Sequence, residues 1–185
     1  MNGEDNSTLW TFVSLAASAG ILSALVTGAI GWSISFFDRR AKASYLALRL
    51  SIALERFAAS VVQALFADQN AKSSGGQIGD DLLYVPPIEE YPEAEEVWPT
   101  LNLHLANRAL TFRLMIQQSN RGIRETYEIL GEEGQDLALK DASRLAHEAV
   151  ILSRDLRHSY SLAQSELSGD LLQVCADMRC RYKDA

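Results

Sequence analysis

The three histidines, His104, His147 and His158, are the side chains best suited to bind a metal or to move a proton near neutral pH. Helical metal sites place their ligands at spacings such as H-x-x-x-H, H-E-x-x-H or E-x-x-H, and none of these occurs in the chain. His147 is followed by Glu148, but adjacent residues on a helix point in different directions. His158 follows Arg154 and Arg157, which predicts a solvated face. We therefore expect no metal site and no bound cofactor.

The two cysteines, Cys175 and Cys180, form neither a C-x-x-C pair nor half of a zinc site. The chain also lacks a glycine-rich phosphate loop, a G-x-S-x-G sequence, and a cysteine or serine with a base at a signature spacing. We expect a protein that is not an enzyme and whose cysteines are reduced thiols in a cytoplasmic domain. The alternative is a helical metalloenzyme or sensor that carries no recognisable motif.

Acidic residues gather around a predicted turn between two helices: Glu125, Glu128, Glu132, Glu133 and Asp136. A cation site there would need carboxylates from both helices to converge on one ion. Acidic residues also favour the start of a helix without any ligand, because the helix dipole is positive at that end. We expect a solvated turn.

Residues 73–98 form a second acidic stretch, which is rich in proline and glycine and contains no base. This composition predicts a loop. The stretch is either an acidic segment that docks a partner or binds a cation, or a solvated connector. Runs of charge in a loop usually only keep it in solvent, which favours the connector. Apolar residues such as Leu82 and Val85 predict that part of the loop packs on the helices. Its seven acidic residues are Asp80, Asp81, Glu89, Glu90, Glu93, Glu95 and Glu96.

The longest apolar stretch runs from Leu9 to Phe37 and contains no charged residue. A helix rises about 1.5 Å per residue, so about 20 residues cross a hydrocarbon core about 30 Å thick. We predict one transmembrane helix, residues 9–37, after a short external tail, residues 1–8. A cleaved signal peptide is the alternative, because Ala17-Ser18-Ala19 resembles a cleavage site, but no basic residue precedes the apolar run.

Aromatic and basic residues mark the two membrane interfaces. Trp10 and Trp32 would lie about 33 Å apart on an ideal helix. The bases Arg39, Arg40 and Lys42 follow the apolar run, whereas the N-terminal tail contains none. Because basic flanks stay in the cytoplasm, the chain is expected in the cell (inner) membrane, with the N-terminus outside and the C-terminal domain cytoplasmic.

Small residues at a spacing of four form one stripe of the predicted transmembrane helix: Ala16, Gly20, Ala24 and Gly28. Such a stripe lets helix backbones approach closely in lipid. It predicts a homo-oligomer formed through this helix, although small residues are common throughout the stretch and the stripe also suits another membrane protein.

Three long amphipathic helices are expected after the membrane segment. Residues 38–72 have apolar residues every three or four positions and continue the transmembrane helix: Leu46, Leu50, Ala53, Leu54, Phe57, Val61, Ala64 and Leu65. Residues 99–163 form an antiparallel hairpin with heptad spacing, as in a coiled coil. Its first helix presents Leu105, Ala109, Phe112, Ile116, Ile123, Tyr127 and Leu130, and its second presents Ala138, Ala142, Leu145, Ala149, Leu152, Leu156 and Ala163.

The predicted fold is therefore all-α, with a transmembrane helix that continues into a cytoplasmic antiparallel bundle of three long helices and no sheet. Residues 164–185 form a short helix or tail, with Leu171–Met178 as its apolar part. The net charge of −7, with the bases concentrated beside the membrane, argues against a nucleic-acid partner.

The function expected from these features is a single-pass membrane-anchored interaction or scaffold protein. Its partners would be the lipid bilayer, a protein that the sequence does not name, and other copies of itself. A membrane-active lysis or toxin protein is the alternative, but most of this chain lies outside the apolar stretch.

Overall fold

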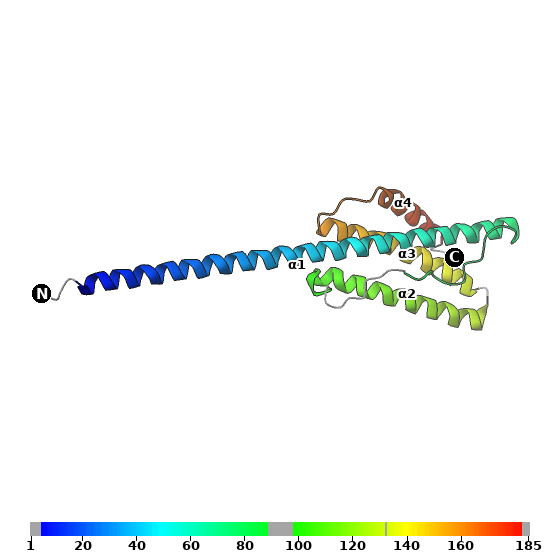
Figure 1. Cartoon of the computed structure of the whole chain (residues 1–185). Coiled ribbons are helices and arrows are strands. Elements are labelled where there is room, and N and C mark those ends of the chain that lie inside the picture. The colour runs from blue at the N-terminus through cyan, green and yellow to red at the C-terminus, as the bar shows by residue number, and fades with distance from the viewer. Residues whose placement is uncertain (1–4, 89–97, 132, 183–185) are drawn as a thin grey trace. The chain divides into compact units, whose positions relative to one another are not determined.

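The computed structural model describes residues 5–88, 98–131 and 133–182, with side-chain surroundings from Asp38 onward except for Leu167. It contains α1 (Asp5–Ser74), a 3-10 turn η1 (Trp98–Thr100), α2 (Leu103–Leu130), α3 (Glu133–Ser159) and α4 (Glu166–Arg181) (Figure 1). No strand occurs within these ranges. The expected all-α class is confirmed.

The chain divides into two compact units, Met1–Ala41 and Lys42–Ala185. In the first unit, the predicted transmembrane residues 9–37 belong to α1. The predicted interface residues Trp10 and Trp32 lie outside the residues whose side chains are described, as does the small-residue stripe Ala16, Gly20, Ala24 and Gly28. Arg39, Arg40 and Lys42 are exposed.

Helix α1 is long and apolar enough to cross a membrane. Among the described side chains, the stretch that meets this criterion is Asp38–Ser74, and half of its most apolar window is buried inside the protein. Leu50, Leu54 and Leu65 in this stretch are completely covered by neighbouring residues. Core packing thus accounts for the apolar character of residues 38–74.

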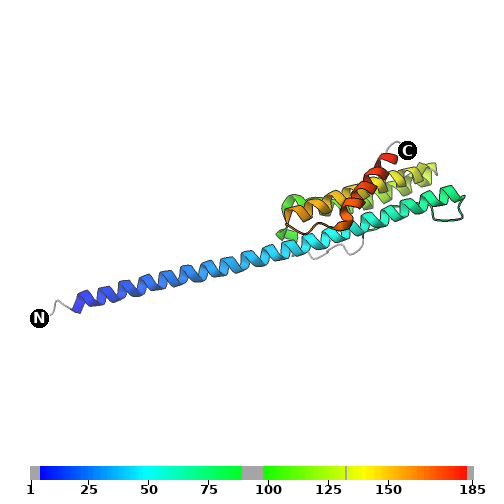
Figure 2. The ribbon, with the colours of Figure 1, turned by 90° about the horizontal axis from the view of Figure 1, so that it is seen from above.

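The core of the second unit lies between the 42–74 part of α1, the loop after it, and helices α2, α3 and α4. α2 and α3 lie side by side in both views of the ribbon, and α4 packs against α3 (Figure 2). On α1, every residue of the predicted apolar stripe is buried except Ala64, which is half-buried. On α3, the predicted heptad lines are buried from Ala138 to Leu156. The 3.6-residue period therefore identified these core faces correctly.

The observed helix ends differ from the expected ones at positions where a single residue caps a helix or adopts a non-helical backbone conformation. α2 begins at Leu103 rather than at Pro99, because the Asn102 side chain accepts a hydrogen bond from the His104 amide, at 2.9 Å, and caps the helix there. α3 ends at Ser159, since Ser161 adopts a left-handed backbone conformation with φ 53°, and Ala163 is exposed beyond it. α4 is longer than the expected Leu171–Met178 segment.

Helices α2 and α3 approach closely near their connection. A Cβ atom added to Gly134 would lie 2.7 Å from the Cα and Cβ atoms of Tyr127. The Tyr127 side chain is nevertheless about half-exposed, and Leu130 in the last turn of α2 is exposed as well. The prediction that these two residues complete the buried face of α2 is wrong.

Candidate functional site

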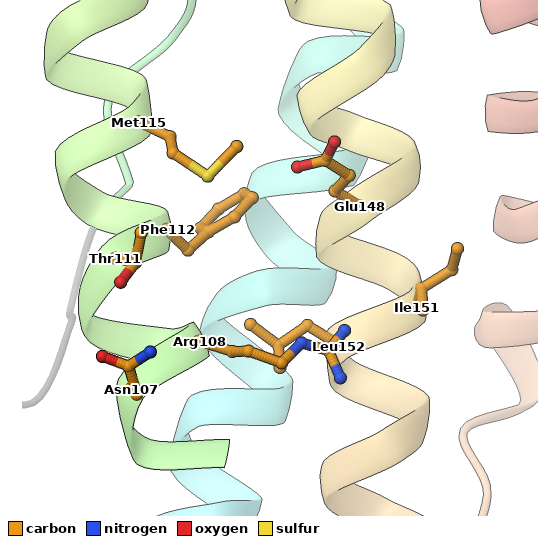
Figure 3. A pocket seen from close by; sticks show the side chains of 8 residues that line it. All are labelled: Asn107, Arg108, Thr111, Phe112, Met115, Glu148, Ile151 and Leu152. Atoms are coloured by element: carbon orange, nitrogen blue, oxygen red, sulfur yellow. The ribbon is translucent and has the colours of Figure 1, made fainter. Parts of the chain in front are cut away.

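A groove of about 360 Å³ runs between α2 and α3, and most of its exposed surface is apolar. Met115 and Phe112 reach into it from α2, and Glu148 and Leu152 reach into it from α3 (Figure 3). Ile151 completes the α3 side. Asn107, Arg108 and Thr111 line the α2 side toward the start of that helix.

The floor of the groove belongs to the core. Phe112 and Leu152 are almost fully buried, and Phe112 packs edge-on against Phe57 of α1 with ring centroids 5.5 Å apart. Met115 and Ile151 are partly exposed above this floor. The groove therefore offers the flexible thioether of Met115 to a ligand, over a floor of core residues (Figure 3).

Ion pairs flank the groove. The Arg108 guanidinium contacts the Asp155 carboxylate from α2 to α3, and both side chains are partly exposed. Glu148 pairs with Arg144 at 3.3 Å, and Arg144 also lies 3.2 Å from Asp141. With their charges paired, these residues leave the groove near neutrality, which suits an apolar occupant with a polar edge.

A ridge of exposed leucines on α2 adjoins the groove. Leu103, Leu110 and Leu114 are 84%, 49% and 55% exposed. Asn107, which lines the groove, lies on the same helical stripe as these leucines. The sequence did contain a signal for this ridge, because Leu103 and Leu110 are seven residues apart, but the same helix offered a longer apolar line that proved to be the core face.

The histidines do not converge on one site. His104 and His158 line one shallow hollow near the start of α2, together with Arg108 and Asp155. His147 lies in a separate pocket between α3 and α4. The expectation that His147 and Glu148 point in different directions is confirmed, since Glu148 lines the groove on the other side of α3. Across the described residues, no cluster of three or more histidine, cysteine or acidic side chains could hold a metal ion.

One charged group that sequence reasoning placed on a solvated face is buried. Arg157 is only 6% exposed and forms a two-pronged ion pair with Glu55 of α1, at 2.8 and 3.1 Å. Ser153 donates a further hydrogen bond to Glu55, at 2.7 Å, and Arg157 donates another to the carbonyl of Ala163. The pair joins residues 102 positions apart in the chain, so local spacing gave no sign of it.

Part of the acidic loop packs on the helices, as predicted. The Val85 backbone forms two hydrogen bonds with the Asn120 side-chain amide, at 2.8 and 2.9 Å. The Leu82 amide donates to the buried Asp68 carboxylate, which also accepts from Gln135 of α3. Of the acidic residues in this loop, Asp80 and Asp81 are exposed, and the others lie outside the described residues.

The cysteines are free thiols with different surroundings. Cys180 is exposed, whereas burial raises the pKa of the Cys175 thiol to about 11. At pH 8 the reactive thiolate of Cys175 is therefore scarce, and its population rises about tenfold per pH unit until the pH nears that pKa. We expect a disulfide reagent to label Cys180 in the folded protein at pH 8 and to leave Cys175 unlabelled. Mass spectrometry of the labelled peptides checks this, and equal labelling rates would contradict the burial of Cys175.

The comparisons with known proteins add no relative to this description. The chain matches no family model, no curated protein and no solved structure.

Proposed function

We propose that the protein is a non-enzymatic scaffold, anchored to the membrane by one N-terminal helix, which binds a second copy of itself through the groove between α2 and α3. The observation that carries this proposal is the pairing of an apolar groove with a leucine ridge beside it.

The anchor is residues 9–37 of α1. The other apolar part of this helix, residues 38–74, is committed to the core of the second unit and carries buried or half-buried acidic groups, Glu55 and Asp68. Residues 9–37 contain no charge and are followed by Arg39 and Arg40, both exposed. The positive flank supports a cytoplasmic C-terminal unit in a single-pass protein of the cell membrane.

The scaffold is an antiparallel bundle of α1, α2 and α3. Three contacts between α2 and α3 support this arrangement: Tyr127 with Gly134, Ser119 with Asp141, and Arg108 with Asp155. As the residue number falls along α2 it rises along α3, which is the order that an antiparallel, coiled-coil-like hairpin requires.

A second copy is the occupant that these surfaces fit best. In a two-fold dimer the same patch serves both partners, so a stable patch must complement itself. A groove over Phe112 and Leu152, with the Leu110 and Leu114 ridge beside it, has this property because each copy can place its ridge in the other groove. Membrane anchoring favours the pairing further, since it holds all copies in one plane and raises their effective concentration.

The test is the association of the full chain in uncharged detergent, measured by sedimentation equilibrium. Leu114→Glu places a charge on the exposed ridge, and we expect it to raise the dimer dissociation constant at least about tenfold, because a desolvated charge at an interface centre has no partner. The measurement is made in a Gly20→Leu/Gly28→Leu background, so that contacts of the small-residue stripe do not hide the effect.

The matched control is Ile129→Glu, which introduces the same charge on the same helix at a residue that is 79% exposed and lies outside the groove. This variant should associate like the parent. If Leu114→Glu also associates like the parent, the groove is not the contact between copies. A further outcome is that another protein co-purifies with the parent but not with Leu114→Glu, while self-association is unchanged. In that case the groove binds that protein, and the self-binding proposal fails.

The orientation has its own test. A reporter fused after Ala185 should be active only as a cytoplasmic reporter, because the basic flank Arg39, Arg40 and Lys42 keeps the second unit inside. An active alkaline phosphatase fusion at this position would place the unit outside and contradict the proposed topology.

A further inference from the structure

A second pocket, of about 380 Å³, lies between α3 and α4 on a side of α3 that the groove does not use. Apolar surface makes up much of its lining, and the polar part consists of basic and hydrogen-bonding side chains. No carboxylate of the described residues lines it, although the chain as a whole has a net charge of −7. The lining residues that matter here are Lys140, Arg144, His147, Arg179, Cys180 and Tyr182.

The cationic groups come from two helices and face the same space. Lys140, Arg144 and His147 are spaced at i, i+4 and i+7 on α3, which places them on one stripe. Arg179 approaches from α4, and its guanidinium lies 3.1 Å from Nδ1 of His147. An anion in this pocket would therefore meet positive groups from opposite walls.

Within the described residues, two of these cations, Lys140 and Arg179, are exposed and have no acidic partner. Arg144 is neutralised by Asp141 and Glu148, at 3.2 and 3.3 Å. Within the described part of the chain, neither Lys140 nor Arg179 forms an ion pair with a carboxylate. A pocket that gathers unneutralised positive charge in an acidic protein has an electrostatic reason to bind an anion.

The imidazole of His147 adds a neutral hydrogen-bond donor. Burial, and then the charge of Arg179, lowers the pKa of His147, while Glu148 opposes this shift. With Nδ1 accepting from Arg179, the ring proton lies on Nε2 and can be donated to a ligand. The other titratable groups at this site are Lys140 and Arg144 on α3, Cys180 on α4, and Tyr182 directly after α4.

We propose that this pocket binds a phosphate group, through Lys140 and Arg179 from opposite walls and His147 between them. A tetrahedral anion with several oxygens matches donors that converge from different directions better than a planar carboxylate does. The volume exceeds that of a bare ion and leaves room for a small organic group attached to the phosphate. The phosphate could be free in solution or part of a lipid headgroup, and the experiment separates these sources.

The test titrates inorganic phosphate into the full chain in phosphate-free buffer and uncharged detergent, and measures binding by calorimetry. Arg179→Gln and Lys140→Gln should each weaken phosphate binding about tenfold or more, because each removes a charge-assisted hydrogen bond. Arg124→Gln is the matched control, since it removes the same charge from an exposed residue of α2 outside the pocket, and it should bind phosphate like the parent.

A second readout uses the exposed thiol of Cys180, which lines the pocket. Phosphate should slow the alkylation of Cys180, and sulfate should do the same, whereas acetate at the same ionic strength should not. In nanodiscs, added phosphatidic acid should weaken the binding of free phosphate if the pocket takes a headgroup, and should leave it unchanged if it takes a soluble phosphate.

The proposal is overturned if millimolar phosphate produces no heat of binding in the calorimeter and does not slow the alkylation of Cys180. It is also overturned if acetate protects as well as phosphate, or if Arg124→Gln weakens binding as much as Arg179→Gln. Circular dichroism of each variant checks that the helices are retained, so that a loss of binding reports on the pocket.

Discussion

Replacing Arg157 with methionine is expected to lower the free energy of unfolding by about 3–5 kcal/mol, since the change strands a buried charge. The Glu55 side chain is only 13% exposed, and its two oxygens are held by Arg157. Methionine fills part of the same volume but offers no positive charge, so the carboxylate stays in the α1–α3 interface without its main partner. Denaturant unfolding of the full chain in detergent, followed by circular dichroism, measures the change.

Two further variants make this result interpretable. Arg108→Met removes the same kind of side chain from the Arg108–Asp155 pair, whose members are 34% and 44% exposed, and it should cost about 1 kcal/mol or less because water screens that pair. The double variant Glu55→Leu/Arg157→Met should recover most of the lost stability, since it removes both charges together. If Arg108→Met and Arg157→Met cost the same, burial is not what makes the Glu55–Arg157 pair important.

The second large effect is expected for Leu152→Ala, which should cost about 2–5 kcal/mol through lost burial and the cavity left behind. Leu152 is 2% exposed and lies on the predicted heptad line of α3. The same substitution should also deepen the groove, because Leu152 forms part of its floor. The midpoint of thermal or denaturant unfolding gives the loss of stability.

The control for this experiment is Leu110→Ala on the neighbouring helix. Leu110 is 49% exposed, so its truncation creates no enclosed cavity and should change the free energy of unfolding by about 0.5 kcal/mol or less. An unchanged stability of Leu152→Ala would show that the heptad line of α3 is not the seam of the core. The association assay on Leu110→Ala then reports on the ridge without a confounding loss of folding.

The apolar period of the sequence was sufficient to predict the core faces of α1 and α3. Leu50 and Phe57 are seven residues apart on α1, and Leu145 lies on a heptad line of α3. Such a spacing places apolar residues on one face of a helix, and neighbouring elements bury that face. The end of α2 was not predictable in the same way, because Tyr127 has an apolar spacing but is exposed where Gly134 of α3 approaches its backbone. That outcome depends on the partner helix and not on the spacing within α2.

The candidate sites depended on contacts that local spacing does not record. Glu55 and Arg157 are 102 positions apart in the chain, so their pairing leaves no pattern in the sequence, and Arg157 was expected on a solvated face. The phosphate pocket needs Arg179 of α4 beside His147 of α3, and the length of α4 was underestimated. Such pairs depend on how the helices pack against one another, which the spacing of residues within one helix does not determine.

The close approach of Gly134 to Tyr127 limits how the second unit can change shape. Helices that switch state often slide past one another by about one turn, roughly 5.4 Å. A slide of α3 by one turn would bring Leu137, which has a side chain, toward the Tyr127 backbone, where even a Cβ atom does not fit. This contact opposes such a slide and favours a movement in which α2 and α3 stay together.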